Sequence, residues 1–175
     1  MEWKSRLFKS RLSKDLKFRK TLQHAPPVNR AEKIAVLWTE TEPPSLEKIK
    51  KLSEPWQSGG VTVELFTFFK KKIKKDETLP GHGISQIDIN WIGIPKWDKI
   101  QGFVDQAFDI LIVPDPNPAP PVLYILSQSA AHFKVGPAST PSDALHLRIE
   151  HKGDFNLDIF WKDLSFLLEK LSAKS

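Results

Sequence analysis

The chain has 175 residues, of which 40% are hydrophobic and 27% are charged, and it contains 11 Phe and 6 Trp. This composition is typical of a single globular domain and excludes a disordered chain. Because there is no Cys, disulfide scaffolds, Cys-ligated zinc, iron–sulfur clusters and thiol catalysis are excluded. The sequence shows no signal peptide and no apolar run near the roughly 18 residues of a membrane span. We therefore expect a cytoplasmic protein without a transmembrane segment.

The positive charge of the chain is concentrated in two segments. Residues 1–20 contain eight Lys or Arg residues against two acids, and a second block between residues 70 and 75 adds five lysines. The remainder carries 13 basic and 19 acidic residues, which gives it a net charge of −6. Nucleic acid is therefore not expected as a partner, and the second block is interpreted as a solvated surface because it lacks interleaved aromatic residues.

The first segment predicts a basic amphipathic helix over residues 1–24, which ends before Pro26 and Pro27. We take residues 1–27 as an arm and residues 28–175 as a single α/β domain. One interpretation is that the arm packs on the domain or on a partner protein. The other is that it contacts an anionic membrane surface, so that the protein is peripheral at the inner membrane. In that case Trp3 and Phe8 enter the headgroup region, and the cations that meet lipid phosphates are Arg6, Lys9, Lys17 and Lys20.

After the arm, strand and helix patterns alternate along the chain. Short apolar or β-branched runs predict strands at 34–38, 61–69, 87–92, 110–113, 133–135 and 145–149. Apolar stripes at helical spacing predict helices from Ser45 to the Gly59-Gly60 pair, over 96–108, over 121–131, and after an Asn156 cap. This alternation favours a mainly parallel, doubly wound, Rossmann-like sheet of five or six strands with helices on both faces. Its strand order is 3-2-1-4-5-6, or 2-1-3-4-5 if residues 87–92 lie outside the sheet.

Ligands of doubly wound sheets bind at the carboxyl ends of the strands, so the loops there are candidate sites. The loop after the first strand, residues 39–45, has no glycine, which disfavours a dinucleotide or phosphate-binding loop. The loop after the fourth strand, residues 114–121, contains five prolines and is therefore rigid. The candidate ligand-binding residues are Asp115 and Asn117 in this loop, and Lys134 and Gly136 in the fifth strand.

A structural interpretation of these four residues remains open. The prolines then set the start of a helix, and Asp115 or Asn117 caps a turn. Lys134 is neutralised by Asp115 or Glu150. In the functional interpretation Lys134 holds a ligand phosphate and Gly136 lets the backbone approach it.

The sequence predicts no metal, no cofactor and no identifiable catalytic residue. The five histidines are scattered without ligand spacing, and no Gly-x-Ser-x-Gly motif is present. An acidic rim of Glu40, Glu42 and Asp115 would suit Mg²⁺ only if the three carboxylates converged, which a sequence does not show.

Residues 90–95 have the pattern Asn-Trp-x-Gly-x-Pro, and residues 133–136 read Phe-Lys-Val-Gly. With segments 108–112 and 124–131, they resemble a family of short, functionally uncharacterised bacterial proteins, a domain of unknown function. Its members also carry a basic N-terminal helix, so the resemblance extends over the whole chain. It implies the fold and no mechanism. The strand–helix–strand segment that starts at residue 108 is also similar to half of a two-domain nucleotide-sugar glycosyltransferase.

We therefore interpret the chain as a non-catalytic α/β binding or interaction protein of unknown role, with its basic helix as the contact arm. The alternative is a small transferase or hydrolase with a crevice near Asp115 and Lys134. Thermal stabilisation by a nucleotide or sugar phosphate would favour this alternative.

Overall fold

A computed structural model describes the conformation of residues 6–11, 31–40, 45–71, 79 and 81–172. Its centre is one sheet of six strands in the order β3-β2-β1-β4-β5-β6, and every neighbouring pair is parallel. The predicted doubly wound sheet and its 3-2-1-4-5-6 order are confirmed. The strands are β1 (Lys33–Glu40), β2 (Thr62–Phe69), β3 (Gly83–Ser85), β4 (Ile110–Ile112), β5 (Phe133–Pro137) and β6 (Leu147–Ile149).

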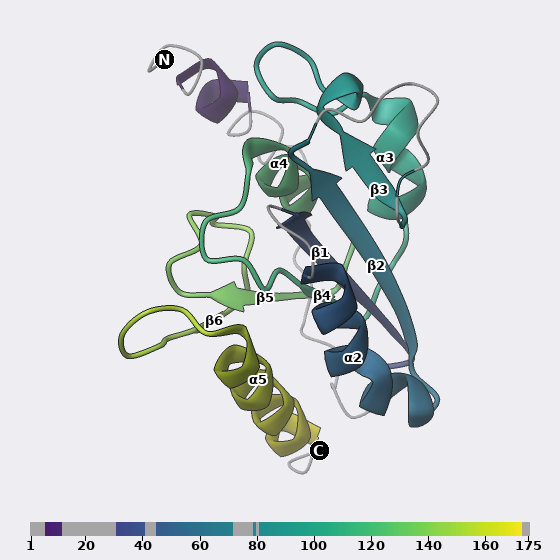
Figure 1. Cartoon of the computed structure of the whole chain (residues 1–175), viewed down its shortest axis with the longest axis vertical. Coiled ribbons are helices and arrows are strands. Elements are labelled where there is room, and N and C mark those ends of the chain that lie inside the picture. The colour runs from purple at the N-terminus through teal and green to yellow at the C-terminus, as the bar shows by residue number, and fades with distance from the viewer. Residues whose placement is uncertain (1–5, 12–30, 41–44, 72–78, 80, 173–175) are drawn as a thin grey trace.

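Four helices cover the two faces of the sheet (Figure 1). They are α2 (Ser45–Ser58), α3 (Trp97–Val104), α4 (Pro120–Gln128) and α5 (Leu157–Ser172). On one face α3 and α4 pack on the sheet around Phe66, Phe103 and Phe108, whose neighbouring rings lie 4.5 and 5.1 Å apart. On the other face α2 and α5 pack on Trp38 and its neighbours, with Phe160 fully buried. Because helices bury both faces, the central strands β1 and β4 are continuous apolar runs.

The third strand does not lie where the sequence predicts it. Residues 86–88 form a 3₁₀ turn, and the rest of segment 87–92 makes only an isolated antiparallel bridge between Ile89 and Pro95. The carboxylate of Asp88 accepts a hydrogen bond from the backbone N–H of Ser85 at 2.9 Å, which turns the chain out of the sheet. The strand is instead Gly83–Ser85, paired with the end of β2.

Gly83 explains why the true third strand was missed. A Cβ atom built at Gly83 would lie far inside contact distance of the Thr67 carbonyl oxygen, so β3 can approach β2 this closely only with glycine. In a sequence, the Gly81-His82-Gly83 segment has the composition of a turn rather than of a strand.

The described part of the N-terminal arm is helical over residues 6–11. The remainder of the predicted 1–24 helix, with Trp3, Lys17 and Lys20, lies outside the described residues. At the other end of the chain the predicted cap is confirmed, because the Asn156 side chain accepts hydrogen bonds from the N–H groups of Asp158 and Ile159. Figure 1 shows helix 6–11 and α5 at opposite ends of the molecule. No helix in the described ranges combines the length and the apolar character needed to cross a membrane.

Candidate functional site

The first candidate site is the carboxyl edge of the sheet between β1 and β4. The strand order reverses here. On one side of this point the sheet continues from β1 to β2 and β3, and on the other side it continues through β4, β5 and β6. Ligands of open α/β sheets bind in the crevice that this reversal creates. The facing loops are residues 41–44, which lie outside the described residues, and the proline-rich loop after β4.

Asp115 lies in the proline-rich loop and binds backbone N–H groups. One of its carboxylate oxygens accepts from Asn117 N at 2.9 Å, and the other accepts from Thr39 N at 3.3 Å. The first bond closes a turn within the loop, and the second fastens the loop to the end of β1. Asn117 is exposed at this loop.

Thr39 makes a second connection across the same crevice. Its hydroxyl oxygen accepts a hydrogen bond of 2.8 Å from the backbone N–H of Ala119, which is the N-cap residue of α4. An anion bound at a helix N-terminus would use such N–H groups. At Ala119 this group is already occupied by a buried threonine of the protein itself.

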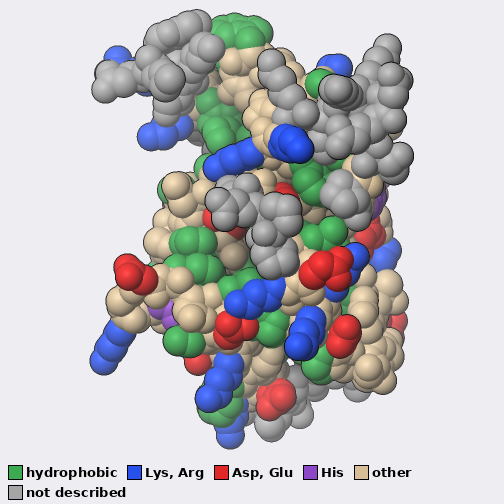
Figure 2. All heavy atoms as spheres, in the orientation of Figure 1, with side chains coloured by type: hydrophobic (Ala, Val, Ile, Leu, Met, Phe, Trp, Pro, Cys, Tyr) green, Lys and Arg blue, Asp and Glu red, His purple; other side chains and the backbone are tan. Residues whose placement is uncertain are grey.

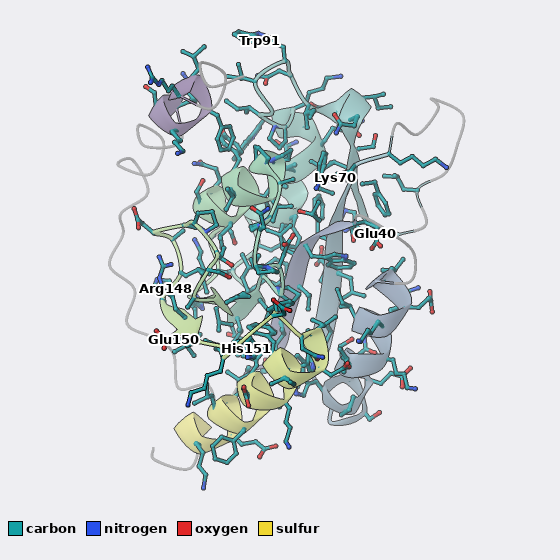
Figure 3. All side chains as sticks on the ribbon, turned by 60° about the vertical axis from the view of Figure 1, so that its left-hand side comes forward. Glu40, Lys70, Trp91, Arg148, Glu150 and His151 are labelled. Carbon is teal, nitrogen blue, oxygen red and sulfur yellow. The ribbon has the colours of Figure 1, made fainter. Side chains whose placement is uncertain are left out.

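The loop between β5 and β6 extends these connections along the sheet edge. The Thr140 hydroxyl donates to the Asp115 carbonyl oxygen at 2.8 Å. The Arg148 guanidinium, labelled in Figure 3, donates to the carbonyl oxygens of Thr140 and Ser142. The loops that follow β4 and β5 are therefore tied to one another and to β1 and β6 by the protein's own polar groups.

Lys134 is buried in β5, with 7% of its surface exposed. Its backbone N–H donates to Nδ1 of His146 at 2.9 Å, and its carbonyl oxygen accepts from the His146 N–H at 2.8 Å. Neutralisation of Lys134 by Asp115 or Glu150 stays a prediction. The carboxylate of Asp115 accepts hydrogen bonds from two backbone N–H groups.

Gly136 is surrounded by protein atoms. A Cβ atom at this position would lie 3.0 Å from the Val113 carbonyl oxygen and 3.2 Å from Cδ1 of Leu145. The packing of Leu145 against the strand therefore accounts for glycine here without a ligand.

The carboxyl edge thus brings Asp115 next to the β5–β6 loop through Thr140, and the hydrogen bond from the Asn117 N–H to the Asp115 carboxylate joins two of the four candidate residues. A ligand-binding role for these four stays a prediction. No sequence motif points to Thr39, Thr140 or Arg148, since each is a single threonine or arginine near a strand end.

The predicted acidic rim is only partly described. Glu40 ends β1, and one of its carboxylate oxygens accepts from the Trp38 indole N–H at 3.0 Å. Its other oxygen is buried and has no hydrogen-bond partner among the described residues, which do not include Glu42. In the part of the chain that the structure describes, no group of three or more acidic or histidine side chains could hold a metal ion.

The second candidate site is the surface at the helix 6–11 end of the molecule. Phe8 is buried, with 6% of its surface exposed, whereas Leu7 is 45% exposed. The cations Arg6, Lys9 and Arg11 are exposed as well. The short helix therefore buries the side chain of Phe8 and exposes its basic side chains.

A rigid loop carries Trp91 at the same end of the molecule (Figures 1 and 3). The Asn90 side-chain oxygen accepts from the N–H groups of Ile92 and Ile94, at 3.1 and 2.9 Å. Gly93 adopts a φ of 90°, which favours glycine and closes the loop. Trp91 is 63% exposed at its tip. Figure 2 shows apolar and basic side chains together at this end. We call Arg6, Leu7, Lys9, Arg11 and Trp91 the basic end surface.

A search against protein-family models matches residues 4–171 to a family described as "Family of unknown function (DUF6913)". The chain belongs to this family. The predicted resemblance to a family of unknown function is confirmed, and the DUF6913 match includes both helix 6–11 and the Trp91 loop. Neither a search of curated proteins nor a search of solved structures found a significant match to this DUF6913 protein.

Proposed function

We propose that this DUF6913 protein is a non-catalytic binding protein that attaches to an anionic membrane surface through its basic end surface. The observation that carries this proposal is the contrast within helix 6–11, where Phe8 is buried and Arg6, Lys9 and Arg11 are exposed. The neighbouring exposed Trp91 supplies the aromatic side chain that such surfaces place at the level of the lipid headgroups (Figure 3).

The charges of the basic end surface support an anionic partner. A lysine or arginine near an anionic leaflet contributes about 1 kcal/mol to binding at physiological ionic strength. Arg6, Lys9 and Arg11 are three such residues on six consecutive positions, and the predicted contacts Lys17 and Lys20 follow in the arm. The proposed location is therefore the cytoplasmic face of the inner membrane.

One part of the sequence-based membrane hypothesis is corrected. Phe8 was expected to enter the headgroup region, but its side chain is buried against the protein. Leu7 and Trp91 are the exposed apolar side chains of this end and take that role in the proposal. The carboxyl edge supports a non-catalytic function, because Asp115 and the N-terminus of α4 already bind groups of the protein.

Cosedimentation of the full chain with vesicles tests the proposal. We expect binding to vesicles of phosphatidylcholine mixed with phosphatidylglycerol, weak binding to pure phosphatidylcholine, and loss of binding at high salt. Changing Arg6, Lys9 and Arg11 together to Gln should weaken binding by more than about tenfold. Trp91→Ala should weaken it without changing its salt dependence.

The matched control removes three exposed lysines from the opposite part of the molecule, by changing Lys50, Lys152 and Lys170 to Gln. This variant has the same net charge as the arm variant and should bind like the unchanged protein. Equal binding to anionic and neutral vesicles, or equal losses in the two charge variants, would contradict the proposal.

A further inference from the structure

A groove between α2 and α5 lies away from the basic end surface (Figure 1). Its volume of about 520 Å³ falls in the range of small-molecule sites. The side chains that matter for recognition are three lysines, one aspartate and two tryptophans: Lys48, Lys51, Lys162, Asp158, Trp56 and Trp161. Figure 2 shows basic and acidic side chains over these two helices.

Two stacked indole rings form the apolar part of the groove. The ring centroids of Trp56 and Trp161 lie 4.9 Å apart, with 24° between the ring planes. Trp161 is 4% exposed and forms the floor, whereas Trp56 is only half-buried. The indole N–H of Trp161 is buried and finds no acceptor among the described residues, so a donor is left unsatisfied in a residue that lines the groove.

The charge of the groove is opposite to that of the domain body. Lys48 is paired with Asp158 at 2.7 Å. Lys51 on α2 and Lys162 on α5 have no acidic partner within the described parts of the chain. Three lysines and one aspartate give the lining a net charge of +2, although the chain outside its two basic blocks carries −6. A local excess of cations on both sides of a groove favours an anion between them.

We propose that the α2–α5 groove binds a small organic anion with a planar ring, of the class of a nucleoside monophosphate. The ring stacks on the indole of Trp56, which is the more exposed of the two tryptophans, since aromatic side chains stack on every kind of base. The phosphate lies between Lys51 and Lys162, which bind it as point charges. This site uses neither the carboxyl edge nor a glycine-rich loop, and it is independent of the proposed membrane contact.

Titration of the full chain with AMP, adenosine and inorganic phosphate tests the proposal, with calorimetry for affinity and the NMR signals of the indole N–H groups for location. We expect AMP to shift the signals of Trp56 and Trp161 and to bind more tightly than adenosine or phosphate. Lys51→Gln together with Lys162→Gln should weaken AMP binding by about tenfold or more. Lys50→Gln together with Lys152→Gln removes the same charge outside the groove and should leave the affinity unchanged.

The lysine variants are the decisive ones. A Trp56→Leu variant would be harder to interpret, because it would also remove packing against Trp161. No shift of either indole signal with AMP, GMP, CMP or UMP would overturn the proposal. So would phosphate binding as tightly as AMP, or an unchanged AMP affinity in the Lys51/Lys162 variant. A change of solution mass in that variant, without an effect on AMP, would identify a second copy of the chain as the occupant and would also overturn it.

Discussion

The Nδ1 atom of His146 accepts a hydrogen bond of 2.9 Å from the backbone N–H of Lys134. The backbone N–H of His146 in turn donates to the Lys134 carbonyl oxygen. The imidazole therefore adds one hydrogen bond between β5 and the segment that precedes β6. The ring is also stacked on Phe133 at 5.8 Å. An imidazole can accept at Nδ1 only when it is neutral, so this contact depends on the protonation state.

The first prediction is that His146 makes the protein less stable in mild acid. Burial of the ring, and secondly the charge of Lys134, lower the pKa of His146 below 6.5. A lowered pKa means that the folded state favours the neutral ring. The stabilisation is therefore present above pH 6.5 and is lost as the pH falls through the folded-state pKa. Urea unfolding at about pH 7.5 and about pH 5 should show the loss.

His146→Gln is the control for this prediction, because its side-chain oxygen can accept the same hydrogen bond without titrating. The other histidines, such as His82 beside Glu64, are the same in both proteins, so their contributions cancel in the comparison. The difference in unfolding free energy between the two proteins should change with pH. A constant difference would contradict the assignment.

The second prediction concerns the hydroxyl of Thr39. Thr39→Val keeps the shape of the side chain but leaves the buried N–H of Ala119 without its acceptor, which costs about 1–3 kcal/mol. Thr39→Ser retains the oxygen and should lose less stability. Thermal and urea unfolding measure both. Equal stability of the valine variant and the unchanged protein would show that the bond contributes nothing.

The third prediction compares two glycines. Gly136→Ala places a methyl group 3.0 Å from the Val113 carbonyl oxygen, and we expect a loss of about 1–3 kcal/mol. Gly102→Ala lies in α3, where the added carbon meets no atom within 4 Å, so it should stabilise the helix by about 0.5–1 kcal/mol. Unfolding measurements check both variants: the midpoint should fall for Gly136→Ala and rise for Gly102→Ala. If Gly136→Ala caused no loss of stability, packing would not explain this glycine. Close approach of the backbone to a ligand would then be the better explanation.

The fourth prediction is that the body folds without the arm. Both hydrophobic clusters of the sheet are built from residues 31–168, and Phe8 belongs to neither. A chain that starts at Asn29 should therefore unfold cooperatively, with a stability reduced by the loss of the Phe8 contact. Phe8→Ala in the full chain should reproduce most of that reduction, and Leu7→Ala should not. An insoluble or non-cooperative shortened chain would show that the arm completes the core.

The fold was predictable because the spacing of apolar residues along the chain follows which faces of each helix and strand are buried. The continuous apolar run at Ile34–Trp38 and the stripe that begins at Leu157 each gave an element of the right type. The third strand was missed because its position depends on Gly83 and on a turn closed by Asp88, and both have the composition of a loop. The candidate site was harder, since the contacts of Asp115 are set by backbone groups of distant residues such as Thr39. Spacing along the chain carries no information about such contacts.

The two outermost strands of the sheet are short. Strands β3 and β6 have three residues each, whereas β1 and β2 have eight each. A short outer strand offers few unpaired N–H and C=O groups as a template for another chain. Molecules concentrated side by side on a membrane would therefore gain little from strand addition, and crowding there does not favour β-aggregation.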